Sequence, residues 1–326
     1  MSKIVDWDRH IGRHLKLRDL HVFFSVVQLG SMAKAAAHFR VTQPAVSQVI
    51  ADLEHALGVK LLDRSPRGVE PTVYGRSLLK GGAAAFDDLK QTIREIEFLS
   101  ESATGEVRIG CPETVASILP PVIESLSLRY PGVVVHVSDV VAPTLDLPQI
   151  RNRELDLAIV RITGSPSRPP FGDDLDVEVL FNDETLVAAD AQSRWAKRRK
   201  LDLAELADAH WILPPAPTTN SMVVFEAFRA RGLSPPHVSL VTFSVTLRTN
   251  LLASGRHITV FPRSMMNLYA TRMSLKVLPV KLPAPEWPTV LVTLKNRTLS
   301  PAAKLFIDQV RAEVKSLNTP ARCGSH

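Results

Sequence analysis

The amino-acid sequence predicts an all-α N-terminal domain, a linker helix and a larger α/β domain built as two lobes. Apolar residues keep a helical spacing in stretches between Leu17 and Leu57 and again in residues 78–99, whereas from Val107 onward short apolar runs alternate with helical stretches, which is typical of βαβ units. Residues 1–80 hold 12 Lys and Arg against 7 Asp and Glu, and the other 246 residues hold 27 against 26. This local basic excess favours a small nucleic-acid-binding module attached to a nearly neutral body.

The composition is that of a globular chain. With 326 residues, 45% of them hydrophobic, the chain can bury a sizeable core and form more than one domain. No apolar run approaches about 18 residues, and the N-terminal stretch MSKIVDWDRHIGRHL lacks the apolar segment of a signal peptide. We therefore expect a cytoplasmic protein without membrane contact. Cys111 and Cys323 belong to no CxxC or Cys/His cluster, so we expect free thiols and no metal site.

The N-terminal region contains a helix-turn-helix pattern. A first amphipathic helix begins near Leu17 and stops at Gly30, a residue suited to helix ends. Ser31 then caps a short Ala-rich helix, and after a three-residue turn Thr42 caps the next one, where Pro44 fits the first turn. In a helix-turn-helix, the second helix enters the DNA major groove with its N-terminal residues toward the base edges.

The second helix of the motif has an unusual polar face. Its apolar residues Val46, Ile50 and Leu53 form one buried stripe, and Gln43, Ser47 and Gln48 form a small, uncharged ridge on another face. Gln can bond adenine edges in a bidentate way, and Ser can act as donor or acceptor. A polar helix face is more often simply solvated, so this ridge alone does not establish base reading.

A wing-like segment follows the helix-turn-helix. Residues 58–72, GVKLLDRSPRGVEPT, predict a short strand, a turn that contains Pro66 and Gly68, and a return strand. Arg64 and Arg67 flank this turn, where they can reach phosphate or a minor groove. The predicted DNA-binding residues, within and around a helix-turn-helix from about Met32 to Ala51, are Ser31, Thr42, Gln43, Pro44, Ser47, Gln48, Arg64 and Arg67.

The linker helix, residues 78–99, carries a short heptad seam. Its members are Leu79, Phe86, Leu89, Ile93 and Ile96. Apolar residues in such a series form the contact face of a coiled coil, or they pack the helix on its own domain. Both interpretations remain open at this point.

After Gly105 the pattern predicts buried strands separated by helices. VRIG, VVVHV and LDLAIV form one series with helices at 114–129 and 144–154, which predicts a parallel sheet. VEVLF, ETLVAAD, HWILP and HITVF form a second series with helices near 221–231 and 245–254. Two α/β lobes result.

The stretch from Leu15 to Leu79 resembles the DNA-binding domain of the LysR-type transcriptional regulators. The residues that carry the resemblance are GSMAKAAAHFRVTQPAVSQVIADLEHALGVKLLDRSPRGVEPTVYGRSLL, with the Ala-rich helix, QPAVS, LE.LG and L.R…G…T..G. Within the family the chain is similar to regulators of a galactose-binding protein and of protocatechuate catabolism. The family often has Arg or Lys where this chain has Gln48. The resemblance implies an antiparallel dimerisation helix and an effector domain similar to periplasmic binding proteins.

The expected organisation combines these interpretations. Its parts are an N-terminal extension (1–14), a winged helix-turn-helix domain (15–76), a linker helix (77–100), an effector-binding domain (104–316) and a disordered tail (317–326). Within the effector domain, lobe I is expected at about 104–162 and 269–316, and lobe II at about 163–268.

In such a domain the effector should lie between the lobes, at carboxyl ends of strands and helix N-termini. The candidate effector-binding residues are Cys111, Glu113, Thr114, Arg161, Thr163, Thr219, Asn220, Ser244 and Thr246. Simple helix capping explains each Ser or Thr about equally well. A carboxylate from Glu113 in the cleft would disfavour a purely anionic effector unless Arg161 neutralises it.

Enzyme classes find no support in the sequence, which lacks a GxSxG elbow, a Walker loop or an HExxH motif in a suitable setting. The prediction is therefore a DNA-binding transcriptional regulator that recognises promoter DNA and a small-molecule effector, with no cofactor and no metal. The expected assembly is a homodimer or homotetramer, with RNA polymerase as a further partner. The alternative is a cytoplasmic solute-binding protein or an architectural DNA-binding protein without effector control.

Overall fold

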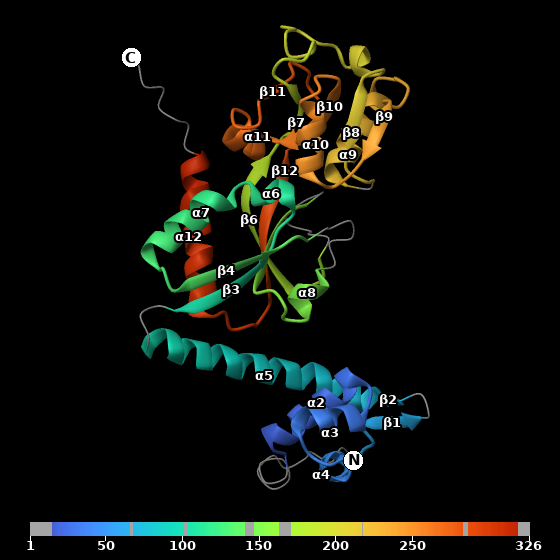
Figure 1. Ribbon diagram of the computed structural model, residues 1–326, viewed down its shortest axis with the longest axis vertical. Coiled ribbons are helices and arrows are strands. Elements are labelled where there is room, and N and C mark those ends of the chain that lie inside the picture. Colours follow the sequence, from blue (N-terminus) through green and yellow to red (C-terminus); the bar gives the residue numbers. More distant parts are fainter. Residues whose placement is uncertain are drawn as a thin grey trace. The chain divides into compact units, whose positions relative to one another are not determined.

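Figure 1 shows the protein as a computed structural model. The structure describes residues 15–65, 68–100, 104–140, 147–162, 171–216, 218–282 and 286–318. The predicted N-terminal extension and most of the predicted tail lie outside these residues. The chain divides into two units, residues 1–90 and 91–326.

Three helices form the body of the first unit. They are α2 (Leu17–Leu29), α3 (Met32–Phe39) and α4 (Gln43–Leu57). α2 ends at Gly30, which has the left-handed φ of 63° expected there. The Ser31 and Thr42 side chains accept hydrogen bonds from the backbone N–H groups of Lys34 and Ala45, so both predicted N-caps are present. Phe23, Val26 and Ile50 are among the fully buried residues of the shared core.

A two-stranded wing follows α4. β1 (Leu62–Ser65) pairs antiparallel with β2 (Gly68–Pro71), and Ser65 lies opposite Gly68. The sequence predicted Gly68 in the turn, whereas in the structure it is the first residue of the return strand. Its backbone lies close to Gly30 at the end of α2. The neighbouring Val69 N–H donates to Gly30 O at 3.1 Å, and a Cβ on Gly68 would lie 2.8 Å from that oxygen. The close approach requires glycine.

Glu54 of α4 fastens the helix to the wing. Its carboxylate accepts hydrogen bonds from the backbone N–H groups of Leu61 at 2.8 Å and Leu62 at 3.2 Å, and from Lys60 Nζ at 2.7 Å. The residue is only 7% exposed. Burial opposes its charge, yet the hydrogen bonds from Lys60, Leu61 and Leu62 prevail and hold the pKa of Glu54 below its ordinary value.

A single long helix, α5 (Val73–Ser100), continues from the wing. It begins four residues before the predicted linker helix at 77–100. The Thr72 hydroxyl accepts a hydrogen bond from Gly75 N–H at 3.1 Å, which satisfies a free N–H group in the first turn.

The second unit contains two five-stranded sheets, so the predicted α/β class with two lobes is confirmed. The lobe I sheet has the order β4-β3-β5-β12-β6, and the lobe II sheet has the order β11-β7-β10-β8-β9. The lobe I elements are β3 (Gly105–Gly110), α6 (Glu113–Ala116), α7 (Leu119–Arg129), β4 (Val133–Ser138), α8 (Pro148–Arg151), β5 (Leu157–Arg161), β6 (Leu175–Asp183), β12 (Trp287–Leu294) and α12 (Pro301–Asn318). The lobe II elements are β7 (Thr185–Asp190), a 3-10 helix (Leu203–Leu206), β8 (His210–Leu213), α9 (Thr219–Ala230), β9 (Val238–Val241), α10 (Val245–Leu252), β10 (His257–Pro262), α11 (Arg263–Tyr269) and β11 (Leu275–Val277).

Both sheets are mixed, which corrects the prediction of a parallel sheet. β3 pairs parallel with β4 and β5, whereas β12 runs antiparallel to β5 and β6. The reversal has a simple cause, because β6 carries the chain toward lobe II and β12 carries it back, side by side in Figure 1. The boundary also differs from the predicted one, since β6 belongs to the lobe I sheet and β11 to the lobe II sheet.

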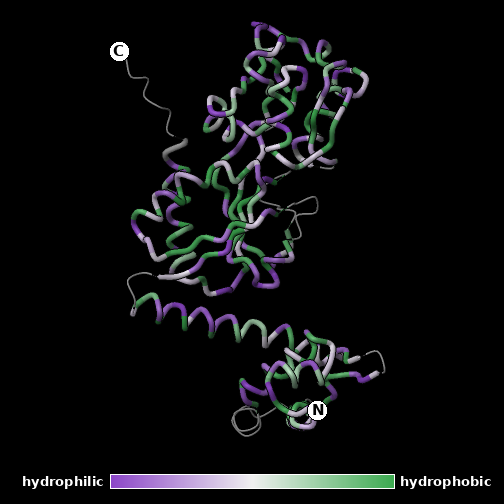
Figure 2. Tube along the Cα trace, in the orientation of Figure 1, coloured by the Kyte–Doolittle hydropathy of each residue, from purple (hydrophilic) through white to green (hydrophobic). Residues whose placement is uncertain are grey.

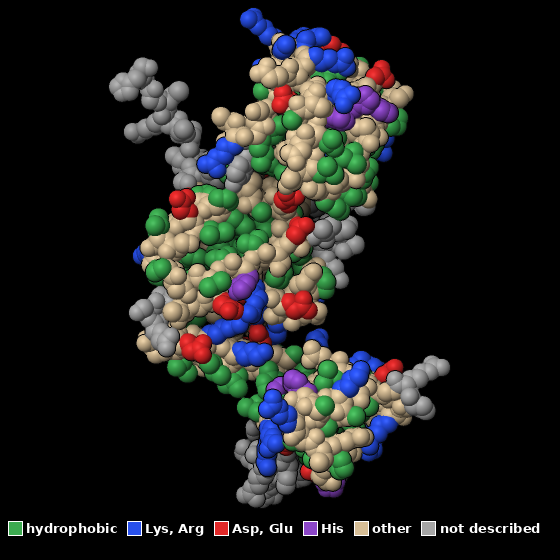
Figure 3. All heavy atoms as spheres, in the orientation of Figure 1, with side chains coloured by type: hydrophobic (Ala, Val, Ile, Leu, Met, Phe, Trp, Pro, Cys, Tyr) green, Lys and Arg blue, Asp and Glu red, His purple; other side chains and the backbone are tan. Residues whose placement is uncertain are grey.

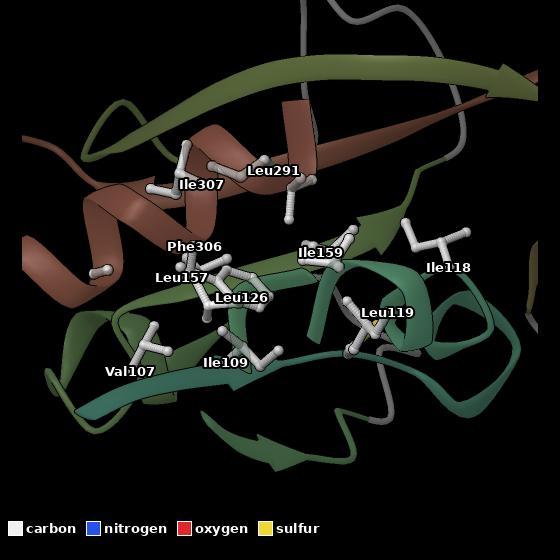
Figure 4. Packing of buried hydrophobic residues seen from close by; sticks show 14 of the residues in the cluster. Val107, Ile109, Ile118, Leu119, Leu126, Leu157, Ile159, Leu291, Phe306 and Ile307 are labelled. Carbon is white, nitrogen blue, oxygen red and sulfur yellow. The ribbon is translucent and has the colours of Figure 1, made fainter. Parts of the chain in front are cut away.

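Each lobe has its own core. In lobe I, α7 and α12 cover one face of the sheet, and Figure 4 shows Leu126 and Phe306 meeting Ile109 and Leu157 there. In lobe II, Trp211 packs edge-on against Phe228 at 6.0 Å between ring centroids. Figure 2 shows that hydrophobic residues, in green, are concentrated along the strands of both sheets. No helix in the described part of the chain is long and apolar enough to cross a membrane.

The Glu54 contacts should make the stability of the first unit depend on pH. Because the folded pKa lies below the unfolded one, the stabilisation is complete above the unfolded pKa and is lost as pH falls through the folded pKa. Glu54→Gln should lower the free energy of unfolding of the first unit by about 1.5–3 kcal/mol at neutral pH and flatten this acid dependence. Hydrogen exchange of the α4 amides measures both effects, with the exposed Glu70→Gln as matched control. An acid dependence as steep as in the parent protein would show that Glu54 does not fasten the wing.

Candidate DNA-reading surface and effector cavity

The polar ridge of α4 faces outward in the structure. Gln43 and Gln48 are exposed and Ser47 is half-buried, whereas Val46 and Ile50 on the opposite stripe are buried. The cap on Thr42 and the proline at the first turn fix where the helix begins and therefore which residues lead it. The ridge is thus presented on a rigid element, which is what a base-reading helix requires.

Two side-chain contacts organise the ridge. Arg64 of the wing donates from Nη1 to Ser47 Oγ at 3.5 Å, so a cation of β1 lies beside the leading turns of α4. Gln48 donates from Nε2 to Asp52 Oδ1 at 2.8 Å. This bond leaves Gln48 Oε1 without a partner among the described residues, and an oxygen there can accept from a base amino group. Asp52 was not predicted, because its role depends on the side-chain direction of its neighbour.

The other predicted DNA-binding residues have varied positions. Ser31 and Thr42 act as N-caps, and Pro44 lies exposed in the first turn of α4. Arg67 lies outside the described residues. Figure 3 shows several Lys and Arg side chains gathered on the visible face of the first unit, in agreement with its basic excess.

The predicted heptad series of α5 separates into two groups. Leu79 packs on the core of the first unit, and the Phe86 ring meets Phe24 edge-on at 5.6 Å between centroids. The remaining members are exposed by 42% (Leu89), 48% (Ile93) and 60% (Ile96). Both interpretations of the sequence therefore apply, each to one part of the helix: the early residues pack on their own domain, and the late ones form an uncovered apolar stripe.

A cavity of about 110 Å³ lies between the two lobes of the second unit. Lobe I and lobe II both contribute to it, at the carboxyl ends of strands as predicted for this class of fold. Its lining residues are Pro112, Glu113, Thr114, Val115, Asp139, Val140, Val160, Arg161, Pro214, Thr218, Asn220, Phe243 and Arg248.

Glu113 connects the lobes across this cavity. From α6 its Oε2 accepts the backbone N–H of Val245 at 2.7 Å, and its Oε1 accepts Thr246 Oγ1 at 3.4 Å. Val245 and Thr246 form the first turn of α10, whose N–H groups have no partners within the helix and favour an anion. The predicted carboxylate in the cleft therefore exists, and it occupies a helix N-terminus of the opposite lobe.

Arg161 forms a second link. From the end of β5 its guanidinium donates to Asn220 Oδ1 at 2.9 Å, to Asp183 O at 2.8 Å and to Thr185 Oγ1 at 2.9 Å. Asn220 belongs to α9 of lobe II, and Asp183 and Thr185 flank the point where β6 passes into β7. Burial lowers the pKa of Arg161 to about 10, opposed by the charge of Asp183. Arg161 does not neutralise Glu113 by a direct ion pair; its hydrogen bonds go elsewhere.

The nine predicted effector residues are distributed as follows. Glu113, Thr114, Arg161 and Asn220 line the cavity. Ser244 caps α10 by accepting Leu247 N–H at 3.1 Å, and Thr246 contacts Glu113. Cys111 is a buried free thiol whose pKa is raised by burial and by Asp139, and it does not line the cavity. Thr163 and the Thr219 side chain lie outside the described residues.

Two further charged residues of the cavity, Asp139 and Arg248, were not predicted. Arg248 lies within α10, where its spacing resembles that of an ordinary surface residue, yet it is only 1% exposed. Asp139 follows β4, one of the two edge strands of the lobe I sheet. The signal that could have found Asp139 was its place just after a strand; for Arg248 no local signal exists.

The comparisons with known proteins agree with this architecture. Two family models match, one described as a bacterial regulatory helix-turn-helix protein of the lysR family over residues 17–76, the other as a LysR substrate binding domain over residues 100–315. The HTH-type transcriptional regulator GbpR of Azospirillum brasilense is 30% identical over 304 residues, which cover 91% of this chain and 86% of that protein. The HTH-type transcriptional regulator TdcA of Escherichia coli (strain K12) is 28% identical over 304 residues, which cover 93% and 94%.

Among solved structures, full-length CbnR complexed with its target DNA has a TM-score of 0.58 at 18% identity, and the match covers 92% of this chain and 100% of that one. A variant of full-length OxyR from Pseudomonas aeruginosa has a TM-score of 0.58 at 21% identity, with coverage of 91% and 98%. At such identities the likeness shows the fold alone. Together with the site, the matches define a DNA-binding regulator with an effector domain. The chain belongs to the LysR family of transcriptional regulators, and its relatives carry the names of regulators, not of enzymes.

The lobe contact of Glu113 can be tested directly. Glu113→Ala should leave the Val245 amide without its acceptor and speed its hydrogen exchange by about 10- to 100-fold, the factor that corresponds to a hydrogen bond with a charged group. Glu124→Ala, on the exposed side of α7, is the matched control and should change nothing at Val245. Unchanged exchange in the Glu113 variant would mean that the lobes do not meet through this carboxylate in solution.

Proposed function

We propose that this LysR-type regulator reads promoter DNA through the Gln43, Ser47 and Gln48 ridge of α4 and responds to a small molecule bound between its lobes. The observation that carries the proposal is the exposed polar ridge with the Arg64 guanidinium 3.5 Å from Ser47 Oγ, because groups that can read bases then lie beside a cation that can contact phosphate. The same proposed interface includes Ser31, Thr42, Pro44 and Arg67.

The effector site of the proposal is the cavity between the lobes. Glu113 and Arg161 each join lobe I to lobe II at its wall, so a ligand there can change how the lobes meet. A ligand that interacts differently with two arrangements of the lobes shifts their populations, and this is how occupancy would reach the DNA-binding unit. The Thr114 hydroxyl lines the cavity without a partner among the described residues and is available to a ligand.

The proposed assembly is a homodimer through α5, extended to a homotetramer through the effector domains, acting in the cytoplasm with RNA polymerase as a further partner. Support for the dimer comes from Leu89, Ile93 and Ile96, whose apolar side chains are exposed along one stripe. The domain plan follows the sequence prediction, with residues 15–76 for DNA, 77–100 for dimerisation and 104–316 for the effector.

A DNA titration tests the reading surface. Gln43→Ala or Ser47→Ala should cost about 1–3 kcal/mol on an operator recovered by selection from random-sequence DNA, with little effect on unselected DNA. Arg64→Ala should weaken both DNAs similarly and reduce the salt slope by about 1. Gln192→Ala, exposed in lobe II, is the matched control. Equal losses on selected and unselected DNA for Gln43→Ala would remove the base-reading role.

The α5 stripe is tested by placing charges on it. Ile93→Glu plus Ile96→Glu should leave mostly smaller species, because burying unpaired carboxylates costs several kcal/mol of association. Light scattering measures the assembly, and Lys90→Glu on the same helix controls for the added charge. Phe86 is left intact because it packs on α2. An unchanged mass in the double variant would place the main interface elsewhere.

A further inference from the structure

The four charged residues of the cavity differ in how many hydrogen bonds they form with the rest of the protein. Arg161 donates three hydrogen bonds and Glu113 accepts two, all to described residues. Arg248 donates one hydrogen bond and Asp139 accepts one from the backbone N–H of Glu113, and none of the four forms an ion pair with a residue that the structure describes. Arg248 and Asp139 are therefore the cation and the anion of the cavity with the fewest hydrogen bonds to described residues.

The guanidinium of Arg248 is buried but forms few hydrogen bonds. It is 1% exposed, donates one hydrogen bond from Nη1 to Val260 O at 3.2 Å, and stacks on Phe261 at 4.6 Å from the ring centroid. Its Nε is buried without a partner among the described atoms. Burial lowers the pKa of Arg248 to about 10, and the charge of Glu113 only partly offsets this. A guanidinium has five N–H donors, so an anion in the cavity would satisfy groups that the fold leaves unpaired.

Asp139 is an anion without a cationic partner among the described residues. Burial and the nearby charge of Glu113 raise its pKa, and only the backbone N–H of Glu113 opposes the rise. Two carboxylates therefore share one side of the cavity with no cation paired to Asp139 in the described chain. Asp139 is exposed to solvent, so a positively charged group beside it would chiefly offset the repulsion from Glu113.

We infer that the cavity selects a small zwitterion, an amino acid whose carboxylate pairs with Arg248 and whose ammonium group pairs with Asp139. This inference rests on the proposed effector site and names its ligand class. A neutral sugar would leave the buried Arg248 guanidinium without an anion, and a simple acid would leave the repulsion between Asp139 and Glu113 in place.

The rest of the cavity indicates the side chain of the amino acid. Apolar groups make up most of the uncharged lining, namely Pro112, Val115, Val140, Val160, Pro214 and Phe243. The volume of about 110 Å³ is of the order of an apolar cavity that holds benzene, about 150 Å³. Both features fit a compact apolar side chain and disfavour a disaccharide.

The experiment compares matched ligands on the full-length protein. The probes are L-alanine, L-valine, L-leucine, L-methionine and L-phenylalanine, each with its analogue that lacks the amino group and its amine that lacks the carboxylate, plus D-galactose and D-galacturonate. Thermal melts find binders and calorimetry gives their dissociation constants. At least one amino acid should bind, and each of its two analogues should bind about 10- to 100-fold more weakly, since each loses one charged contact.

Two variants assign the contacts. Asp139→Asn should weaken the amino acid about tenfold or more and leave the analogue without the amino group unchanged. Arg248→Met should weaken both, and Arg256→Met, on an exposed arginine of lobe II, is the matched control. If the buried Arg248 variant fails to fold, the exposed Asp139 variant still decides the matter.

The results separate the ligand class from the site itself. If a sugar or a simple acid binds and no amino acid does, the zwitterion inference is wrong while the effector site stands. If an amino acid binds but Asp139→Asn leaves its selectivity over the analogue without the amino group unchanged, the ammonium group lies elsewhere and the inference is wrong. If none of the probes shifts the melt, both the ligand class and the proposed effector site lose their support.

Discussion

The two-lobed domain depends on a carboxylate that bridges its halves. Glu113 leaves lobe I and ends on the first turn of α10 in lobe II, where it does for that helix what a bound anion would do. Arg161 makes the second bridge, at the point where β6 passes into β7. Both residues line the cavity, so the contacts they make between the lobes form part of its wall. A ligand must fit the space that they leave, or loosen one of them.

The DNA-binding unit uses the same physical device. Glu54 captures two backbone N–H groups at the start of the wing and holds β1 against α4, as Glu113 holds α10. The wing then keeps Arg64 within reach of Ser47. In both units a carboxylate takes up N–H groups that secondary structure leaves unpaired, and in doing so it sets the relative position of two elements. Buried polar groups must be satisfied, so these contacts specify geometry as well as contributing stability.

Local features of the fold were predictable because they depend on neighbouring residues. Gly30, Ser31 and Thr42 fix helix ends through their own backbone and side-chain chemistry, and the structure has each of them where the sequence indicated. Sheet membership was not predictable in this way. Apolar runs identify strands but carry no direction, so the antiparallel β12 and the true place of β6 became clear only from the pairing. The same distinction applies to the cavity residues. Glu113 and Arg161 were predictable because they lie next to strands and helix N-termini in the sequence. Arg248 lies inside a helix, and only its burial in the folded structure identifies it as a cavity residue.

The proposed function requires the cavity between the lobes and the reading helix to belong to one coupled system. Coupling between two sites is reciprocal, so a ligand that changes the DNA-bound state must itself bind differently when DNA is present. The decisive experiment is a calorimetric dissociation constant of the cavity ligand, taken on free protein and again on protein saturated with operator. We expect two values that differ by about fivefold or more, the lower end of typical allosteric coupling. Equal dissociation constants in the two states would contradict the coupling, because the cavity would then have no influence on DNA.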